Sequence, residues 1–76
     1  MKREEMLEAF VEKNDIETEI TEATKLSEIE EWDSLAAVTT LALFYKNLGL
    51  KINASDIKKC ITIKDLLDLG NGEYDE

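Results

Sequence analysis

The sequence predicts a small all-α domain: a four-helix bundle with a long loop between its first two helices and a short third helix. Apolar residues recur at helical spacing along most of the chain. The 76 residues include no proline, and length alone allows one domain. We therefore expect a single domain over residues 1–76, ordered over about 3–69, with a flexible tail at 71–76.

The first helix is expected over about residues 3–14. Leu7, Phe10 and Val11 follow the i, i+3, i+4 spacing of an apolar stripe. Residues 15–31 are rich in acidic and β-branched residues and lack such a stripe, which predicts a long loop. Its apolar residues would pin it to the core: Ile16, Ile20, Leu26 and Ile29. A loop of this length usually contains a short helical turn, and Ser27-x-x-Glu30 has the spacing to cap one.

The second helix should begin at Asp33 or Ser34 and run to about Leu48. Its apolar residues are expected to share one face: Leu35, Val38, Leu41, Ala42, Tyr45 and Leu48, widened by Ala37, Leu43 and Phe44. A helix this apolar is expected to be central and packed on more than one side. Gly49 is placed to end it in the left-handed conformation, with Leu50 folding back as an apolar contact.

A short third helix is expected over about Ser55–Cys60, capped by Asn53 or Ser55. The last helix should start at Thr62, where Thr62-x-x-Asp65 resembles a capping box. Ile61 and Leu66 have the spacing of a hydrophobic staple. The buried side of this helix would consist of Ile63, Leu66, Leu67 and Leu69, and Gly70 would end it.

Charge limits the possible partners. Nine basic and eighteen acidic residues give a formal net charge of −9, so the chain should repel nucleic acids and anionic membranes and attract basic protein surfaces.

No apolar run is long enough for a membrane span, and the charged N-terminus lacks a secretory signal. One cysteine excludes an internal disulfide. Together these features predict a cytoplasmic protein, and we expect a monomer.

Catalysis is not expected from this composition. The chain has no histidine to activate Ser34, and it has no cluster with zinc-ligand spacing or glycine-rich phosphate loop.

Cys60 is expected to be a small core residue, although a reactive thiol is an alternative. Trp32 is expected to cover the bundle, a role compatible with shaping the loop before Ser34. Ser34 itself is either a helix cap or an attachment point, since a helix N-terminus also favours a phosphate.

Two segments resemble the acyl carrier protein family. They are W-D-S-L-A-A-V at residues 32–38 and I-N-A-S-D-I-K-K-C-I-T-I-K-D-L-L-D at residues 52–68, and the resemblance covers roughly residues 3–69. It implies a non-catalytic carrier. A phosphopantetheinyl transferase would move 4′-phosphopantetheine from coenzyme A onto Ser34, and the thiol of this arm would carry acyl groups as thioesters. The resemblance also implies that Asp33 and Leu35 help the transferase recognise the site, and that partner enzymes touch Val38.

The chain departs from common fatty-acid carriers at two points. Trp32 replaces the glycine or alanine before the aspartate, and no acidic residue lies between Leu35 and Ser55. The resemblance therefore favours a specialised pathway, with acyl or aminoacyl cargo and ligase or synthase partners that dock through basic or apolar surfaces. The family's bundle interior can shelter an acyl chain, and the residues for such a space would be Val38, Leu41, Ala42, Ile57 and Ile63, although we expect them to be core.

Two other functions remain open from sequence. One is an acidic helical protein–protein interaction module without a prosthetic group, in which Ser34 is only a cap. The other, more remote, is a small enzyme.

Overall fold

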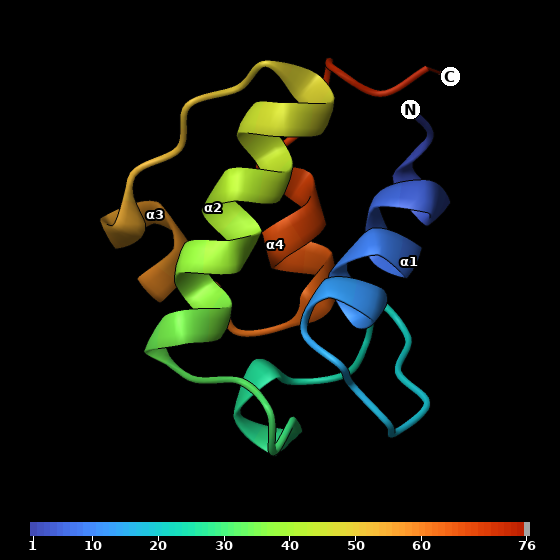
Figure 1. Cartoon of the computed structure of the whole chain (residues 1–76), viewed down its shortest axis with the longest axis vertical. Coiled ribbons are helices and arrows are strands. Elements are labelled where there is room, and N and C mark those ends of the chain that lie inside the picture. The colour runs from blue at the N-terminus through green and yellow to red at the C-terminus, as the bar shows by residue number, and fades with distance from the viewer. Residues whose placement is uncertain (76) are drawn as a thin grey trace.

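The helices of the computed structural model, which describes residues 1–75, match the predicted four-helix bundle (Figure 1). The elements in order are α1 (Arg3–Lys13), a short 3₁₀ helix η1 (Leu26–Glu28), α2 (Ser34–Leu48), α3 (Ala54–Lys58) and α4 (Ile63–Asp68). The third helix is thus shorter than predicted and starts one residue earlier. The all-α fold with a long first loop and a short third helix is confirmed.

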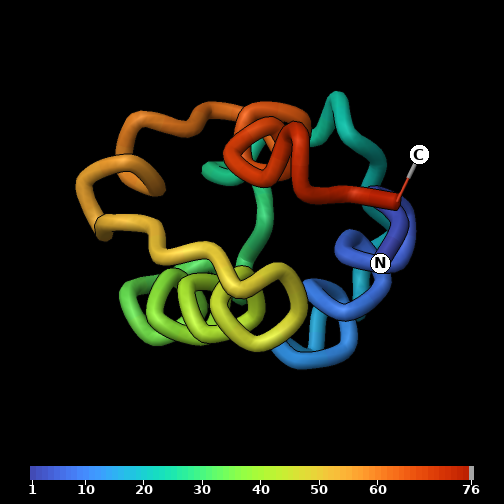
Figure 2. Tube along the Cα trace, turned by 90° about the horizontal axis from the view of Figure 1, so that it is seen from above, coloured from blue at the N-terminus to red at the C-terminus, as the bar shows by residue number. Residues whose placement is uncertain are grey.

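The core lies between the four helices. Seen from above in Figure 2, α2 and α4 face each other, and α1 and α3 lie at opposite sides of the space between them. All four helices contribute buried apolar side chains: Met6 and Phe10 from α1, Leu43 and Phe44 from α2, Ile57 from α3, and Ile63, Leu66 and Leu67 from α4. One apolar core therefore positions every helix.

The buried face of α2 differs from the predicted one. Its buried residues are Ala36, Thr40, Leu43 and Phe44. Thr40 is tolerated there because its hydroxyl donates a 2.8 Å hydrogen bond to the carbonyl oxygen of Ala36. The prediction that Leu35, Val38, Ala42 and Tyr45 face inward with Leu41 and Leu48 is wrong, because the helix turns these four outward.

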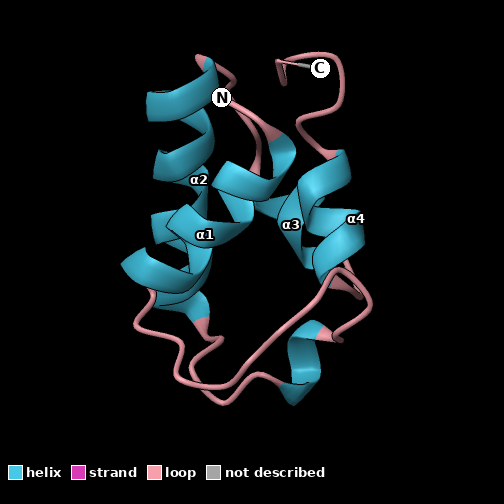
Figure 3. Cartoon of the chain, turned by 90° about the vertical axis from the view of Figure 1, so that its right-hand side faces the viewer, coloured by secondary structure: helices cyan, strands magenta, loops and turns pink. Residues whose placement is uncertain are grey.

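The long loop between α1 and α2 runs along one end of the bundle (Figure 3). Ile16, Leu26 and Ile29 are buried as predicted, and Ile20 packs partly against the core. Backbone hydrogen bonds also tie the loop to the start of α4: Leu26 N–H donates to the carbonyl of Ile61 at 2.8 Å, and Ile63 N–H donates to that of Thr24 at 2.9 Å. The predicted helical turn exists as η1, but its N-cap is Lys25 rather than Ser27.

The predicted helix ends are largely confirmed. Gly49 has φ 65°, and Leu50 N–H donates back to the carbonyl of Phe44 at 3.3 Å. Thr62 caps α4 by accepting the N–H of Asp65 at 3.2 Å. The hydrophobic staple is not formed as predicted, since Ile61 remains 65% exposed.

Residues 71–75, assigned from sequence to a flexible tail, make contacts with the bundle. The Tyr74 hydroxyl donates a 2.7 Å hydrogen bond to the carbonyl of Leu67, and its ring packs against the core. A Cβ at Gly70 would lie 2.7 Å from that hydroxyl, so this glycine permits the close approach. The flexibility of the tail stays a prediction, and Glu76 lies outside the described residues.

Candidate functional site

Ser34 is the first residue of α2, and Asp33 is the N-cap of this helix. Asp33 has an extended backbone (φ −149°, ψ −171°), and its Oδ1 accepts the N–H of Ala36 at 2.8 Å. This arrangement is a standard N-cap, and it means that the serine is not needed for capping. Ser34 is exposed, and within residues 1–75 its hydroxyl makes no hydrogen bond. From sequence, Ser34 could have been either the helix cap or an attachment point, and the structure gives the cap to Asp33.

The segment before Ser34 is anchored by aromatic packing. The ring of Trp32 lies against that of Phe10, with centroids 5.8 Å apart and an interplanar angle of 46°. The backbone N–H of Trp32 also donates to the carbonyl of Ile29 at 3.1 Å, and Ile29 is buried. The expected structural role of Trp32 is confirmed. Because Ala36 is buried on the other side, Ser34 is held between two anchored positions.

Local charge at Ser34 has opposing contributions. The preceding segment carries four acids: Glu28, Glu30, Glu31 and Asp33. The first turn of α2 contains no acidic residue, and the free N–H groups of a helix start favour a bound anion. A phosphate on Ser34 would therefore be favoured by the helix and opposed by the approaching loop.

An open groove lies beside Ser34, between the start of α2 and α3, with a volume of about 350 Å³. It is lined by Trp32, Asp33, Ser34, Ala37, Ile57, Lys58 and Cys60. Its walls are mostly apolar, and Ser34 is one of the residues that line it. Lys58 is a site residue that we did not predict from sequence, because only the packing of α3 brings it to this groove.

The outward face of α2 forms an apolar stripe, which we define as Leu35, Val38, Ala42 and Tyr45. Leu35 is 72% exposed, Val38 61% and Tyr45 58%. These residues are spaced three or four apart, so they follow one side of the helix from the residue after Ser34. Neighbouring exposed apolar side chains of this kind are typical of a surface that contacts a partner.

The five residues that the resemblance offered as lining for an acyl-chain space lie in different environments, in agreement with the expectation that they do not form one. Ile57 and Ile63 are buried core residues, as we favoured, and Leu41 is partly buried, whereas Val38 and Ala42 lie on the outer surface of α2. These residues therefore do not line one common interior space.

Cys60 is a partly buried thiol. It packs against the core, and its Sγ lies 3.5 Å from the carbonyl oxygen of Asp56. Burial, with the nearby charges of Asp65, Asp56 and Asp68, raises its pKa. A raised pKa lowers the thiolate fraction, which supports the predicted packing role over a reactive one.

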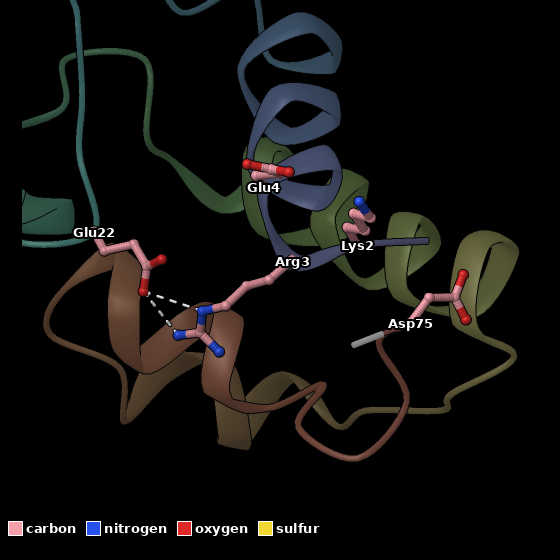
Figure 4. A pocket seen from close by; sticks show the side chains of 5 residues that line it. All are labelled: Lys2, Arg3, Glu4, Glu22 and Asp75. Carbon is pink, nitrogen blue, oxygen red and sulfur yellow. Dashed lines mark hydrogen bonds and ion pairs between the residues drawn. The ribbon is translucent and has the colours of Figure 1, made fainter.

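A second charged cluster, away from Ser34, is centred on Arg3 (Figure 4). The guanidinium pairs with Glu22 at 2.9 Å and with Asp68 at 2.6 Å, and it lies 5.9 Å from the ring centroid of Tyr74. It therefore joins α1, the long loop, α4 and the tail. The pKa of Asp68 is lowered by Lys64 and by Arg3. The charges of Arg3, Glu22 and Asp68 are paired with one another, so the cluster has a structural role in holding these segments together.

Within residues 1–75, no group of acidic residues and cysteine is arranged to hold a metal ion. Among the same residues, no helix has the length and apolar content needed to cross a membrane.

The comparison with known families decides what this arrangement is. A family model described as the phosphopantetheine attachment site matches residues 4–69, which is most of the chain. The chain belongs to this carrier-protein family. No curated protein and no solved structure matches it significantly. Carrier domains of this family bear covalent 4′-phosphopantetheine and work with phosphopantetheinyl transferases and biosynthetic enzymes. They are generally non-catalytic.

Proposed function

We propose that this carrier holds its 4′-phosphopantetheine arm on Ser34. The observation that supports the proposal is the exposed Ser34 hydroxyl at the start of α2, left free because Asp33 supplies the cap. The helix N-terminus favours the phosphate, and the adjacent groove leaves room beside the hydroxyl. The residues present therefore fit the group. When bound, the arm supplies a thiol that carries acyl groups as thioesters.

The chain's own contribution to loading is position rather than proton transfer. Ser34 would lose its hydroxyl proton as its oxygen bonds to the phosphorus of coenzyme A that bears the pantetheine. The pyrophosphate P–O bond on the other side of that phosphorus would break, and adenosine 3′,5′-bisphosphate would leave. The chain has no histidine, and the carboxylate of Asp33 is engaged by the N–H of Ala36. We propose that the base comes from the transferase and that Asp33 acts by holding the helix start in place.

The apolar stripe of α2 is the proposed docking surface for the transferase and for the enzymes that load and unload the arm. Leu35 and Val38 are both more exposed than buried and lie within two turns of Ser34. No acidic residue lies between Leu35 and Ser55, and the exposed side chains of the stripe offer apolar contact. The acidic loop before Ser34 would supply long-range attraction to basic partners.

The lack of acidic residues on α2 also supports a specialised pathway over general fatty acid synthesis. A carrier with this surface suits dedicated ligases or synthases whose docking sites are apolar. We propose acyl or aminoacyl cargo and a monomeric carrier in the cytoplasm.

Loading in vitro tests the attachment site. The protein is incubated with coenzyme A and a phosphopantetheinyl transferase of broad specificity, and its intact mass is measured. Wild type and Ser55→Ala, which changes an exposed serine on α3, should each gain the mass of one arm, whereas Ser34→Ala should gain none. If Ser34→Ala is still loaded, the assignment to Ser34 is wrong.

A further inference from the structure

Lys58 is the basic residue among those that line the groove beside Ser34. Lys58 is the last residue of α3, and α3 lies alongside α2 in Figure 1. Within residues 1–75 it forms no ion pair, and its side chain is exposed. The next residue, Lys59, is also an exposed cation but does not line the groove. Packing therefore gives these two neighbouring lysines different surroundings.

The surroundings of Ser34 create a need for a positive charge. Asp33 lines the same groove, and Glu28, Glu30 and Glu31 approach in the preceding segment. A phosphodiester on Ser34 would add another negative charge to this region. The positive end of α2 offsets part of the repulsion, but a helix terminus carries only a partial charge. A full positive charge in the groove would offset more.

We propose that Lys58 is the counter-ion of the phosphodiester and holds the phosphate end of the arm at this groove. The proposal rests on Ser34 being the attachment residue. A lysine ammonium is a compact charge that binds phosphate without demanding a fixed geometry, which suits an exposed position. Among the residues that line the groove, Lys58 carries the positive charge, and the first turn of α2 adds the partial positive charge of a helix start. Lys58 is thus a positioning residue that acts after loading.

The test compares apo and loaded protein for wild type, Lys58→Gln, Lys58→Arg and the matched control Lys59→Gln. The midpoint of thermal unfolding (Tm) and the phosphorus NMR resonance of the phosphodiester are measured for each. Lys58→Gln should lower the Tm of loaded protein by about 1–8 °C more than that of apo protein, as expected for one exposed ion pair in a domain of this size. It should also move the phosphorus resonance. Lys58→Arg and Lys59→Gln should leave both close to wild type, and high salt should reduce the wild-type effect.

Two results overturn the proposal and are distinguishable. If the variants load but Lys58→Gln and Lys59→Gln have equal effects on Tm and on the phosphorus resonance, Lys58 is not the counter-ion, while attachment at Ser34 stands. If wild type acquires no arm on Ser34, the attachment proposal fails and this one fails with it.

Discussion

Removal of the α2 cap is expected to destabilise the fold by a predictable amount. In Asp33→Ala, the Ala36 N–H loses the carboxylate that accepts it at 2.8 Å. Loss of such a cap costs about 1 kcal/mol. For a domain of this size, that corresponds to a fall in Tm of about 4–8 °C. Asp33→Asn should keep most of the stability because an asparagine side chain also caps, so the cap and the charge can be separated.

Thermal unfolding followed by far-UV circular dichroism measures this effect. Glu30→Ala is the matched control, because it removes a nearby exposed acid and should change stability by less than about 0.5 kcal/mol. If Asp33→Ala is as stable as wild type, the start of α2 does not depend on this hydrogen bond and the assignment of Asp33 as its stabilising cap is wrong.

Four further predictions concern other parts of the molecule. Arg3→Met should lower the free energy of unfolding in urea by about 1–2 kcal/mol. The loss is smaller than for a fully buried ion pair because the carboxylates of Glu22 and Asp68 are partly exposed, and high salt should reduce the difference between the two proteins. Burial raises the pKa of Tyr74 to about 12, above the value near 10 of an unfolded chain. The stability that Tyr74 contributes to the fold is therefore complete below about pH 10 and should fall as pH rises from 10 towards 12, and Tyr74→Phe should remove that part of the alkaline loss in Tm. Val38→Ser should leave Tm nearly unchanged but slow loading by the transferase, whereas Leu43→Ala, at a buried position of the same helix, should cost about 2–5 kcal/mol. In loaded protein at pH 8, iodoacetamide should alkylate the arm thiol before Cys60, whose pKa is raised, and peptide mass spectrometry would show the order.

Capping patterns in the sequence located one helix start and one helix end correctly, although the predicted cap of η1 was wrong. The Thr62-x-x-Asp65 pattern and Gly49 correctly predicted the start of α4 and the end of α2. These signals depend on residues close together in the chain, and the hydrogen bonds that they form are local. The position of Ser34 on the first turn of α2 was predictable for the same reason.

The buried face of α2 was not predictable in this way. The helix is apolar on nearly every side, so periodicity does not select one face, and the polar Thr40 turned out to be buried while Leu35 and Val38 are exposed. Thr40 is accommodated by a hydrogen bond within its own helix, which an apolar pattern does not register. The exposed stripe is the more informative result, since it supplies a surface for partners.

Contacts between distant segments were also beyond the sequence. Arg3 meets Glu22 and Asp68 only because α1, the long loop and α4 converge. The contact of Tyr74 with Leu67 and the position of Lys58 beside Ser34 depend likewise on packing. No local spacing rule encodes these pairs.

Peptide mass spectrometry of the protein purified from its own cells would show whether Ser34 bears the arm. We expect the peptide containing Ser34 to carry 4′-phosphopantetheine, with any cargo held as a thioester on the arm. Recovery of that peptide without the arm in every preparation, or an arm found on another residue, would contradict this expectation.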